Sequence, residues 1–405
     1  MKIVHFTSAF LPQVGGAEIA VHDIASMQSR LGHDVSVLVS FKSWMATSRT
    51  APYRTIPLFP ASNRLSFLCA TVPALRRVMA LQVAAWQRRH RFDIWHIHYA
   101  YPAAYVAIDT LHRMRVGCVV TCHGADVQQR SLGKDTSPQP GPVRGAVREA
   151  LLKADAVTAL STDVRNGYAA LGVQEDHITN IPHFIDVDRF RRAGGREKMR
   201  ATLGIKDNEK LILSLGRHHP IKGLEIIPDV IKELRRERDD FVWLVVGSGT
   251  KALLTAATRE KTAARLRVMP PIVPPAGSGE WAFPSEKLLR VYNAADLLVA
   301  PSRQESFGRV MLEGMAAGLP VVGTDIPAFR ELMSGETPGI LTPVDDYEAM
   351  AKVLNQLLDS DAMRRTLGAS ACRTACQYTP AAVMKDYTAV YKRVAKHYAR
   401  DAQET

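Results

Sequence analysis

The stretch DLLVAPSRQESFGRVMLEGMAAGLPVVGTDIPAFRE, residues 296–331, predicts a strand, a loop, a helix and a second strand in succession. Residues 297–300 form a short apolar run, typical of a parallel strand that is buried on both faces. A loop over 301–308 follows, and from Arg309 the apolar spacing fits a helix that ends at the Gly-Leu-Pro of 318–320. Residues 320–323 then predict a second buried strand. Such alternation indicates a doubly wound parallel sheet.

This order of elements also predicts a ligand site. Ligands of open α/β sheets bind beyond the carboxyl ends of the strands, where the amides at the start of the next helix attract anions such as phosphate. Glu305 lies in the loop after the strand, and Glu313 lies about one turn into the helix. We expect Glu313 to accept hydrogen bonds from hydroxyls, while two ordinary surface glutamates remain the alternative on spacing alone.

The same alternation covers the rest of the 405 residues, which is enough chain for two domains of ordinary size. A helix is expected over 17–31 and a polar interdomain linker over 188–210. The predicted strands form two sets: 2–8, 34–41, 93–98, 117–121 and 156–161 in the first half, then 211–215, 241–246, 267–272, 297–300, 320–323 and 339–342 in the second.

Glu305-Ser-Phe-Gly308 with Glu313 resembles the Glu-x7-Glu signature of the retaining, nucleotide-sugar-dependent glycosyltransferases of family 4, and the similarity extends through 301–302 and 315–322. The resemblance implies the GT-B fold, in which two Rossmann-like doubly wound parallel-sheet domains face each other across a cleft. It places an acceptor-binding domain at 1–190, a nucleotide-sugar-binding domain at 191–378, and a C-terminal helix over 379–405 that crosses back to the first domain.

The resemblance also implies the donor site. Gly216-Arg-His-His-Pro-Ile-Lys-Gly223 is similar to the family's Gly-Arg…Lys-Gly clamp, and two fixed cations suit a diphosphate, although a solvated basic loop would show the same residues. Glu313 would then hold the ribose and Glu305 the sugar. The expected diphosphate-binding residues are Gly15, Gly16, Arg217, Lys222, Phe307, Gly308, Arg309 and Val310.

Two features of the first half complete the expected site. Gly15 and Gly16 lie between a strand and a helix, where they serve either a plain turn or, as the resemblance favours, close approach of backbone amides to a phosphate. His123 follows a predicted strand and resembles the family's cleft histidine, which hydrogen-bonds the donor sugar. His123 and Glu305 are therefore the expected catalytic residues. His96 and His98 are interpreted as packing or cleft-lining residues.

Several patterns keep other interpretations open. Gly247-x-Gly249 follows a strand and would suit a nicotinamide-dependent enzyme, and a non-catalytic sugar-nucleotide-binding homologue is a further alternative. Asp186-x-Asp188 has the form of a metal motif but lacks its context, so we expect no metal and no cofactor, with a UDP- or GDP-linked sugar as co-substrate. His183-Phe184, where the family has Asn-Gly, and the Pro/Gly-rich segment 270–284 are expected to affect specificity.

Charge indicates the partners. The net charge is +12, and residues 1–195 hold 22 Lys/Arg against 14 Asp/Glu. This balance suits an acidic ligand, nucleic acid or an anionic membrane, but the basic residues lack the interleaved aromatics of a nucleic-acid surface. Residues 35–92 contain no acid and nine Lys/Arg, and 73–90 predicts a helix with Leu75, Val78, Met79 and Trp86 on one face. We expect either a helix packed on the first sheet or, through 42–91, reversible binding to an anionic membrane.

The expected activity is therefore metal-independent, retaining transfer of a hexosyl-type sugar to a glycan, glycolipid or small-molecule acceptor, in assembly of cell-surface polysaccharide or glycolipid. The five cysteines suit reduced thiols. No apolar run reaches the length of a membrane span and the N-terminus predicts a strand. We therefore expect a cytoplasmic protein, peripheral on the inner membrane face if the basic segment binds lipid.

Overall fold

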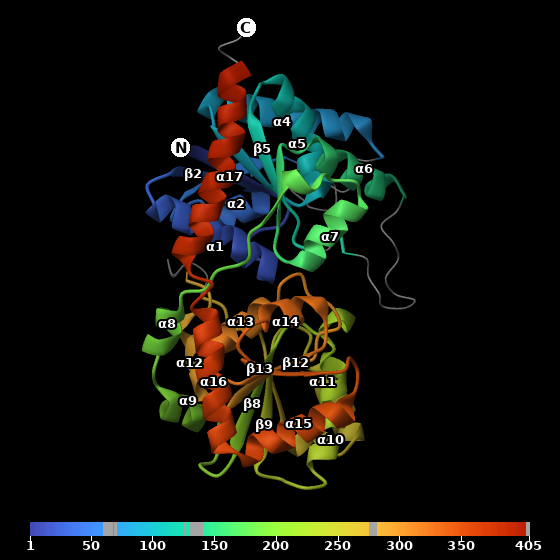
Figure 1. The fold of residues 1–405 in the computed structure, drawn as a ribbon, viewed down its shortest axis with the longest axis vertical. Coiled ribbons are helices and arrows are strands. Elements are labelled where there is room, and N and C mark those ends of the chain that lie inside the picture. The colour runs from blue at the N-terminus through green and yellow to red at the C-terminus, as the bar shows by residue number, and fades with distance from the viewer. Residues whose placement is uncertain (60–67, 69–70, 125, 129–140, 275–281, 402–405) are drawn as a thin grey trace. The chain divides into compact units, whose positions relative to one another are not determined.

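In a computed structural model of the protein, residues 1–59, 68, 71–124, 126–128, 141–274 and 282–401 are described, and the chain divides into two compact units (Figure 1). The first unit comprises the described residues within Met1–His183, Pro275–Phe283 and Ala381–Thr405, and the second comprises Phe184–Pro274 and Pro284–Pro380. Arg64, Cys69 and residues 275–281, on which parts of the sequence predictions depend, lie outside the described residues.

The first unit is built on a parallel sheet of seven strands in the order β3-β2-β1-β4-β5-β6-β7. Its centre is apolar, with Phe6 and Trp95 buried edge to face. The strands are β1 Lys2–Thr7, β2 Asp34–Ser40, β3 Arg54–Leu58, β4 Ile94–His98, β5 Gly117–Thr121, β6 Ala156–Ala159 and β7 Ile178–Asn180. The main helices are α1 Gly16–Arg30, α2 Phe41–Thr47, α4 Pro73–His90, α5 Tyr105–Arg113, α6 Gly141–Lys153 and α7 Thr162–Ala170.

The second unit is built on six parallel strands in the order β10-β9-β8-β11-β12-β13. These strands are β8 Lys210–Leu215, β9 Phe241–Val246, β10 Leu266–Met269, β11 Leu297–Ala300, β12 Val321–Thr324 and β13 Gly339–Thr342. Its helices are α8 Val187–Arg192, α9 Arg196–Thr202, α10 Ile227–Leu234, α11 Ala252–Arg259, α12 Glu286–Ala294, α13 Arg309–Ala316, α14 Pro327–Leu332, α15 Tyr347–Asp359 and α16 Asp361–Ala375. The expected linker over 188–210 thus contains two short helices, α8 and α9.

The C-terminal helix α17, Pro380–Asp401, packs on the first unit, as the sequence predicted (Figure 1). The Tyr391 hydroxyl hydrogen-bonds Nδ1 of His96 on β4 at 2.7 Å, and the Tyr398 hydroxyl donates to Asp155 at 2.8 Å. A Cβ on Gly117 would overlap Val394, so the glycine at the start of β5 lets the helix approach the sheet. These contacts join residues that are 243 to 295 positions apart.

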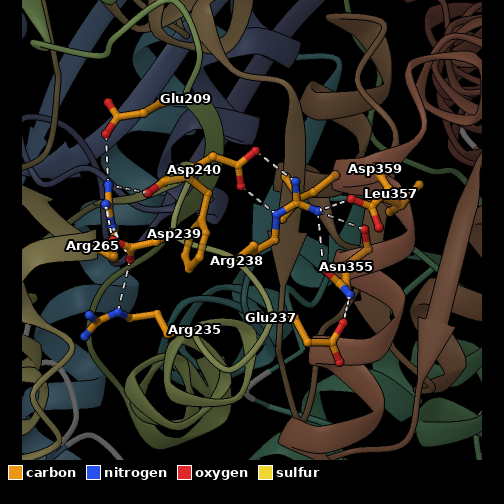
Figure 2. Close-up of polar contacts among 12 residues, drawn as sticks. Glu209, Arg235, Glu237, Arg238, Asp239, Asp240, Arg265, Asn355, Leu357 and Asp359 are labelled. Atoms are coloured by element: carbon orange, nitrogen blue, oxygen red, sulfur yellow. Dashed lines mark hydrogen bonds and ion pairs between the residues drawn. The ribbon is translucent and has the colours of Figure 1, made fainter.

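A network of ion pairs lies at the amino ends of the strands in the second unit (Figure 2). Arg238 contacts Asp240 at 2.7 Å and Asp359 at 2.6 Å, which ties the loop before β9 to the end of α15. Arg265, just before β10, pairs with Glu209 at 2.9 Å and with Asp239 at 2.6 Å. Because these cations are matched by carboxylates, the network stabilises the edge of the sheet opposite to the one where ligands are expected.

Candidate active site

The strand orders place a switch point in each sheet. Such a point arises where the chain reverses its direction of progress across the sheet, between β1 and β4 in the first unit and between β8 and β11 in the second. Ligands of doubly wound sheets bind outside the carboxyl ends of the two strands that flank this point. The loops after β1, β8 and β11 all carry residues that the sequence analysis singled out.

In the second unit, the loops after β8 and β11 are in direct contact. The backbone N–H of Arg303 donates to the carbonyl of Ile221 at 2.8 Å. Gly223 has φ +60°, and a Cβ on it would overlap the carbonyl oxygen of Pro301. Glycine is therefore required at this position for the two loops to meet.

This contact brings two predicted site residues together. The Lys222 ammonium lies 2.6 Å from Oε1 of Glu305, and the Ser302 hydroxyl donates to the same oxygen at 2.9 Å. Arg217, in contrast, is exposed and has no ion-pair or hydrogen-bond partner for its guanidinium among the described residues. The loop after β8 thus presents one cation held by a carboxylate and one that is available to an anion.

Glu313 lies on the buried side of α13 and has two partners. The Tyr292 hydroxyl donates to Oε2 at 2.6 Å, and Nε of Arg309 donates to Oε1 at 3.0 Å. Burial raises the pKa of the Tyr292 hydroxyl, and the neighbouring Glu313 carboxylate adds to this shift, so Tyr292 stays protonated and acts as a donor. A carboxylate oxygen has two lone pairs, so Glu313 can still accept hydrogen bonds from a ligand.

The start of α13 is shaped by Gly308. This residue has φ +95° and precedes the helix without a side-chain cap. A Cβ on Gly308 would overlap Phe329, and one on Gly314 would come within 2.8 Å of Leu298 on β11. The glycines therefore let α13 lie close to the sheet, while the amides that the sequence analysis named, Phe307 to Val310, lie at the helix N-terminus. Amides there suit a bound anion.

The glycines of the first loop serve a different purpose. Gly15 has an extended backbone and Gly16 begins α1. A Cβ on Gly15 would meet only the carboxylate end of Glu18, and one on Gly16 would meet nothing within 4 Å. Open space therefore lies beside Gly16, whereas Oε2 of Glu18 lies 2.5 Å from the place of a Cβ on Gly15.

His123 follows β5 and is partly exposed at the end of a stack of histidines in the first unit, of which His5, His96 and His98 are fully buried. Its Nε2 lies 3.1 Å from Nδ1 of His98, and His98 Nε2 lies 3.0 Å from Nδ1 of His5. His183, which the sequence analysis linked to specificity, is buried with its ring stacked on that of His123, at 6.3 Å between ring centroids.

Burial keeps these histidines neutral. It lowers the pKa of His5 and of His123 to about 4, and it lowers the pKa of His96 and of His98 well below 6.5. The carboxyl of Asp126, which accepts the backbone N–H of Ala100 at 2.7 Å, is shifted the other way, because burial raises its pKa to about 6.

The remaining motifs have structural roles. A Cβ on Gly247 would overlap the carbonyl of Gly216, so this glycine lets the loops after β8 and β9 meet. Asp186 caps α8 by accepting the backbone N–H of Arg189 at 3.3 Å, and Asp188 is exposed. Packing of the two loops thus explains Gly247, and capping of α8 explains Asp186.

Sequence reasoning missed the residues that support the named ones. Tyr292 comes from α12, while Gln28 and Tyr391 come from helices that flank the first sheet. The only sequence signal for His5 is its place on a strand with His96 and His98 on another. Gln28 and Tyr391, which bond each other, are 363 residues apart, and no local sequence pattern predicts such a contact.

Two parallel doubly wound sheets with a long C-terminal helix define the GT-B fold. Solved structures share this fold: the sucrose-phosphate synthase of Thermosynechococcus elongatus aligns with TM-score 0.76 and 18% identity over 97% of this chain and 99% of that one. The Anabaena protein Alr3699/HepE, solved in complex with UDP, aligns with TM-score 0.75 and 19% identity over 98% and 100%.

Family models match both halves: Glycosyltransferase Family 4 over residues 14–189 and Glycosyl transferases group 1 over 209–360. The D-inositol 3-phosphate glycosyltransferase of Xylanimonas cellulosilytica is 30% identical over 321 residues, 75% of this chain and 71% of that protein. The N-acetyl-alpha-D-glucosaminyl L-malate synthase of Bacillus anthracis is 24% identical over 94% of each chain. The chain belongs to glycosyltransferase family 4, and it transfers a sugar from a nucleotide sugar.

Proposed function

We propose that the protein is a retaining, metal-independent glycosyltransferase that uses a UDP-linked sugar. The observation that carries this proposal is a grouping at the β8–β11 switch point. It comprises Arg217, which has no partner among the described residues, the Lys222–Glu305 pair and the helix that holds Glu313. UDP in the complex of Alr3699/HepE supports uracil as the base of the donor nucleotide, in preference to the guanine of a GDP-linked sugar.

The charges of this site suit departure of a diphosphate. In glycosyl transfer the sugar becomes oxocarbenium-like as the leaving diphosphate gains negative charge, so fixed cations and amides aimed at that group lower the barrier. Arg217, Lys222 and the amides of Phe307 to Val310 supply this stabilisation, with the amides at Gly15 and Gly16 as further donors. These groups neutralise the charge of the leaving diphosphate, which is the role of a divalent metal in other transferases.

The carboxylates and the histidine position the substrate. Glu313, held by Tyr292 and Arg309, accepts the ribose hydroxyls. Glu305, held by Lys222 and Ser302, accepts sugar hydroxyls, and His123 hydrogen-bonds a further substrate hydroxyl. The acceptor class is a glycan, a glycolipid or a small molecule. The names of the two relatives contain inositol 3-phosphate and L-malate, which favours small polar acceptors as the first to be screened.

The test is titration calorimetry with UDP, followed by UDP release from a panel of UDP-sugars. Arg217→Ala and Lys222→Ala should each weaken UDP binding by about 1.5–3 kcal/mol, because each removes a charge-assisted contact to phosphate. Arg365→Ala, which removes an exposed arginine from α16, is the matched control and should bind like the parent. Equal UDP affinity in all four proteins would refute the diphosphate site.

We also propose that residues 42–91 bind an anionic membrane surface. Among the described residues, seven of the thirteen exposed large apolar side chains lie between Phe41 and Leu81. On α4, Met79 and Val83 are buried against the first sheet, whereas Val78 and Leu81 are exposed beside Arg77 and Arg88. The apolar residues of α4 therefore lie on two faces of the helix, one packed on the sheet and one exposed. An exposed apolar face that is bordered by arginines suits a lipid interface.

Not every basic residue of this segment is available. Arg76 pairs with Asp109 at 2.8 Å and lies over the ring of Tyr105, so it helps to pack α4. No described helix is both long and apolar enough to cross a bilayer. Sedimentation with phosphatidylserine vesicles should show binding that high salt reverses and that Leu81→Asp abolishes. Leu152→Asp changes an exposed apolar residue of α6 and should bind vesicles like the parent. Equal sedimentation of the two variants would contradict membrane binding through α4.

A further inference from the structure

Arg303 holds together three loops at the carboxyl edge of the second sheet. It lies in the loop after β11, between Ser302 and the predicted site residue Glu305. Its side chain is only 13% exposed, because it contacts both the loop after β8 and the loop after β13. All of these loops belong to the second unit.

Towards the loop after β8, Arg303 binds the short 3₁₀ turn that ends at Lys222. The backbone N–H of Arg303 donates to the carbonyl of Ile221 at 2.8 Å, and its Nη1 donates to the carbonyl of Pro220 at 2.6 Å. Nη1 also pairs with the carboxylate of Glu225. Arg303 thus contacts the two residues before Lys222 and one residue shortly after it, which fixes the backbone of the lysine from both sides.

Towards the loop after β13, Arg303 is anchored by Asp345. Nε and Nη2 of Arg303 each lie 2.7 Å from Oδ1 of Asp345. The backbone of Asp345 has φ +61°, in the left-handed region. This conformation costs an aspartate free energy that a glycine would not lose. The carboxylate that meets Arg303 is therefore present at a position where the backbone alone would favour glycine.

The charge of Arg303 is already matched within the second unit. Glu225 and Asp345 supply two carboxylates, and the carbonyl of Pro220 accepts a further hydrogen bond. This cation lies at the ligand edge of the sheet, but its donors are directed at neighbouring loops. Its contribution to the site is therefore the position of the loops that it joins.

We propose that Arg303 is a positioning residue for sugar transfer, which holds the turn of Lys222 against the loop of Glu305. The proposal rests on the diphosphate-binding role of Lys222 in the proposed function and deepens it. A lysine ammonium is carried on a flexible stem, so its place is defined only when its backbone and its carboxylate partner are both fixed. A cation that is fixed before the ligand binds stabilises the leaving diphosphate at a lower entropic cost.

The experiment is a double-mutant cycle, measured by titration calorimetry of the full-length protein with UDP. Arg303→Ala should weaken UDP binding about fivefold to tenfold, which is less than the effect of Lys222→Ala, because the ammonium is displaced but still present. If Arg303 acts through Lys222, its loss has no further effect once the ammonium is gone. The variant that carries both substitutions should therefore bind UDP like Lys222→Ala, within about twofold.

Arg238→Ala is the matched control. Arg238 belongs to the same unit, its side chain is 12% exposed, and it pairs with the two carboxylates of Asp240 and Asp359 at the opposite edge of the sheet. Its loss removes the same kind of ion pairs, but UDP affinity should stay within about twofold of the parent. This control separates the position of Lys222 from a general loss of stability.

Asp345→Gly tests the same link with little risk to the fold. It removes the carboxylate that anchors Arg303, and a glycine suits φ +61° better than an aspartate does. UDP binding should weaken by a smaller factor than in Arg303→Ala, and the substitution should have no effect in the Lys222→Ala background. If Arg303→Ala is poorly folded by circular dichroism, Asp345→Gly decides the proposal.

Three results would overturn the positioning role. The first is parent-like UDP affinity in Arg303→Ala and Asp345→Gly while Lys222→Ala binds more weakly, which would leave the diphosphate site in place. The second is a double variant that adds the full effect of Arg303→Ala to that of Lys222→Ala, since the two residues would then act independently. The third is parent-like affinity in Lys222→Ala. Only if Arg217→Ala also binds like the parent is the proposed diphosphate site refuted as well.

Discussion

The buried histidines predict a marked loss of stability in mild acid. A neutral histidine with a pKa of about 4 when folded and 6.5 when unfolded binds fewer protons in the native state between these values. Its contribution is therefore complete above pH 6.5 and is lost as the pH falls towards 4. From pH 7 to pH 5, His5 and His123 each cost about 2 kcal/mol of unfolding free energy. His96 and His98, whose pKa values are also lowered, act in the same direction.

Two groups of the first unit oppose this loss. The pKa of Asp126 is raised from 3.8 to about 6, so its native state gains protons as the pH falls, and this recovers about 1.3 kcal/mol at pH 5. His112, whose pKa is raised by its bond to Asp155, also favours the native state as it becomes protonated. For His5, His123 and Asp126 together we expect a net loss of about 2.5 kcal/mol from pH 7 to pH 5, which is a large share of the stability of an ordinary domain.

The assay is urea unfolding at pH 7 and pH 5, followed by hydrogen exchange of peptides that cover β1 and β4, so that the first unit is measured separately. Asp126→Asn removes a carboxyl group whose protonation stabilises the native state in acid. It should therefore increase the loss of unfolding free energy between pH 7 and pH 5 by about 1.3 kcal/mol. His123→Gln removes one histidine with a lowered pKa and should decrease the loss by about 2 kcal/mol. Equal stability at both pH values in the parent, or the same loss in all three proteins, would refute the assignment of buried neutral histidines.

Three further results are expected. Tyr292→Phe should lower the unfolding free energy of the second unit by about 1.5–3 kcal/mol and weaken UDP binding, because it removes a buried donor to a carboxylate; unchanged urea midpoints and UDP affinity would contradict this. Glu313→Ala should mainly weaken nucleotide binding, whereas Glu305→Ala should mainly slow sugar transfer; calorimetry and initial rates separate the two effects, and parent-like turnover in both would show that the motif is misinterpreted. Transfer should survive EDTA, and full inhibition that manganese reverses would indicate a metal-dependent site.

The second unit was predicted closely from its sequence, because its strands are short apolar runs closed by glycine or proline. The strand expected at 297–300 is β11, and the helix expected from Arg309 begins there. The strand expected over 267–272 ends at Met269 instead, since Pro270 and Pro271 cannot continue the ladder of hydrogen bonds.

The first unit was predicted less completely. The strand β3 was missed because Arg54-Thr-Ile-Pro-Leu58 is an edge strand with a proline and little apolar character, and α2 was missed because it follows β2 without a turn signal. On α4, periodicity gave the helix but could not tell which apolar residues face the sheet. Met79 is buried and Val78 is exposed although they are neighbours, because the contact with the sheet, not the pattern, selects the face.

The positions of the arginines in the fold distinguish those that can bind a ligand from those that form stabilising ion pairs. Composition alone does not make this distinction. The net charge of +12 is compatible with many partners, and the residue type alone does not distinguish Arg217 from Arg238 or Arg265. The structure does: Arg238 and Arg265 lie at the amino ends of the strands and are each matched by two carboxylates (Figure 2). Arg217 lies at the carboxyl end, at the switch point, and has no such partner among the described residues. A cation left unmatched where parallel sheets bind their ligands is most simply explained by an anionic ligand, and a diphosphate supplies the missing charge.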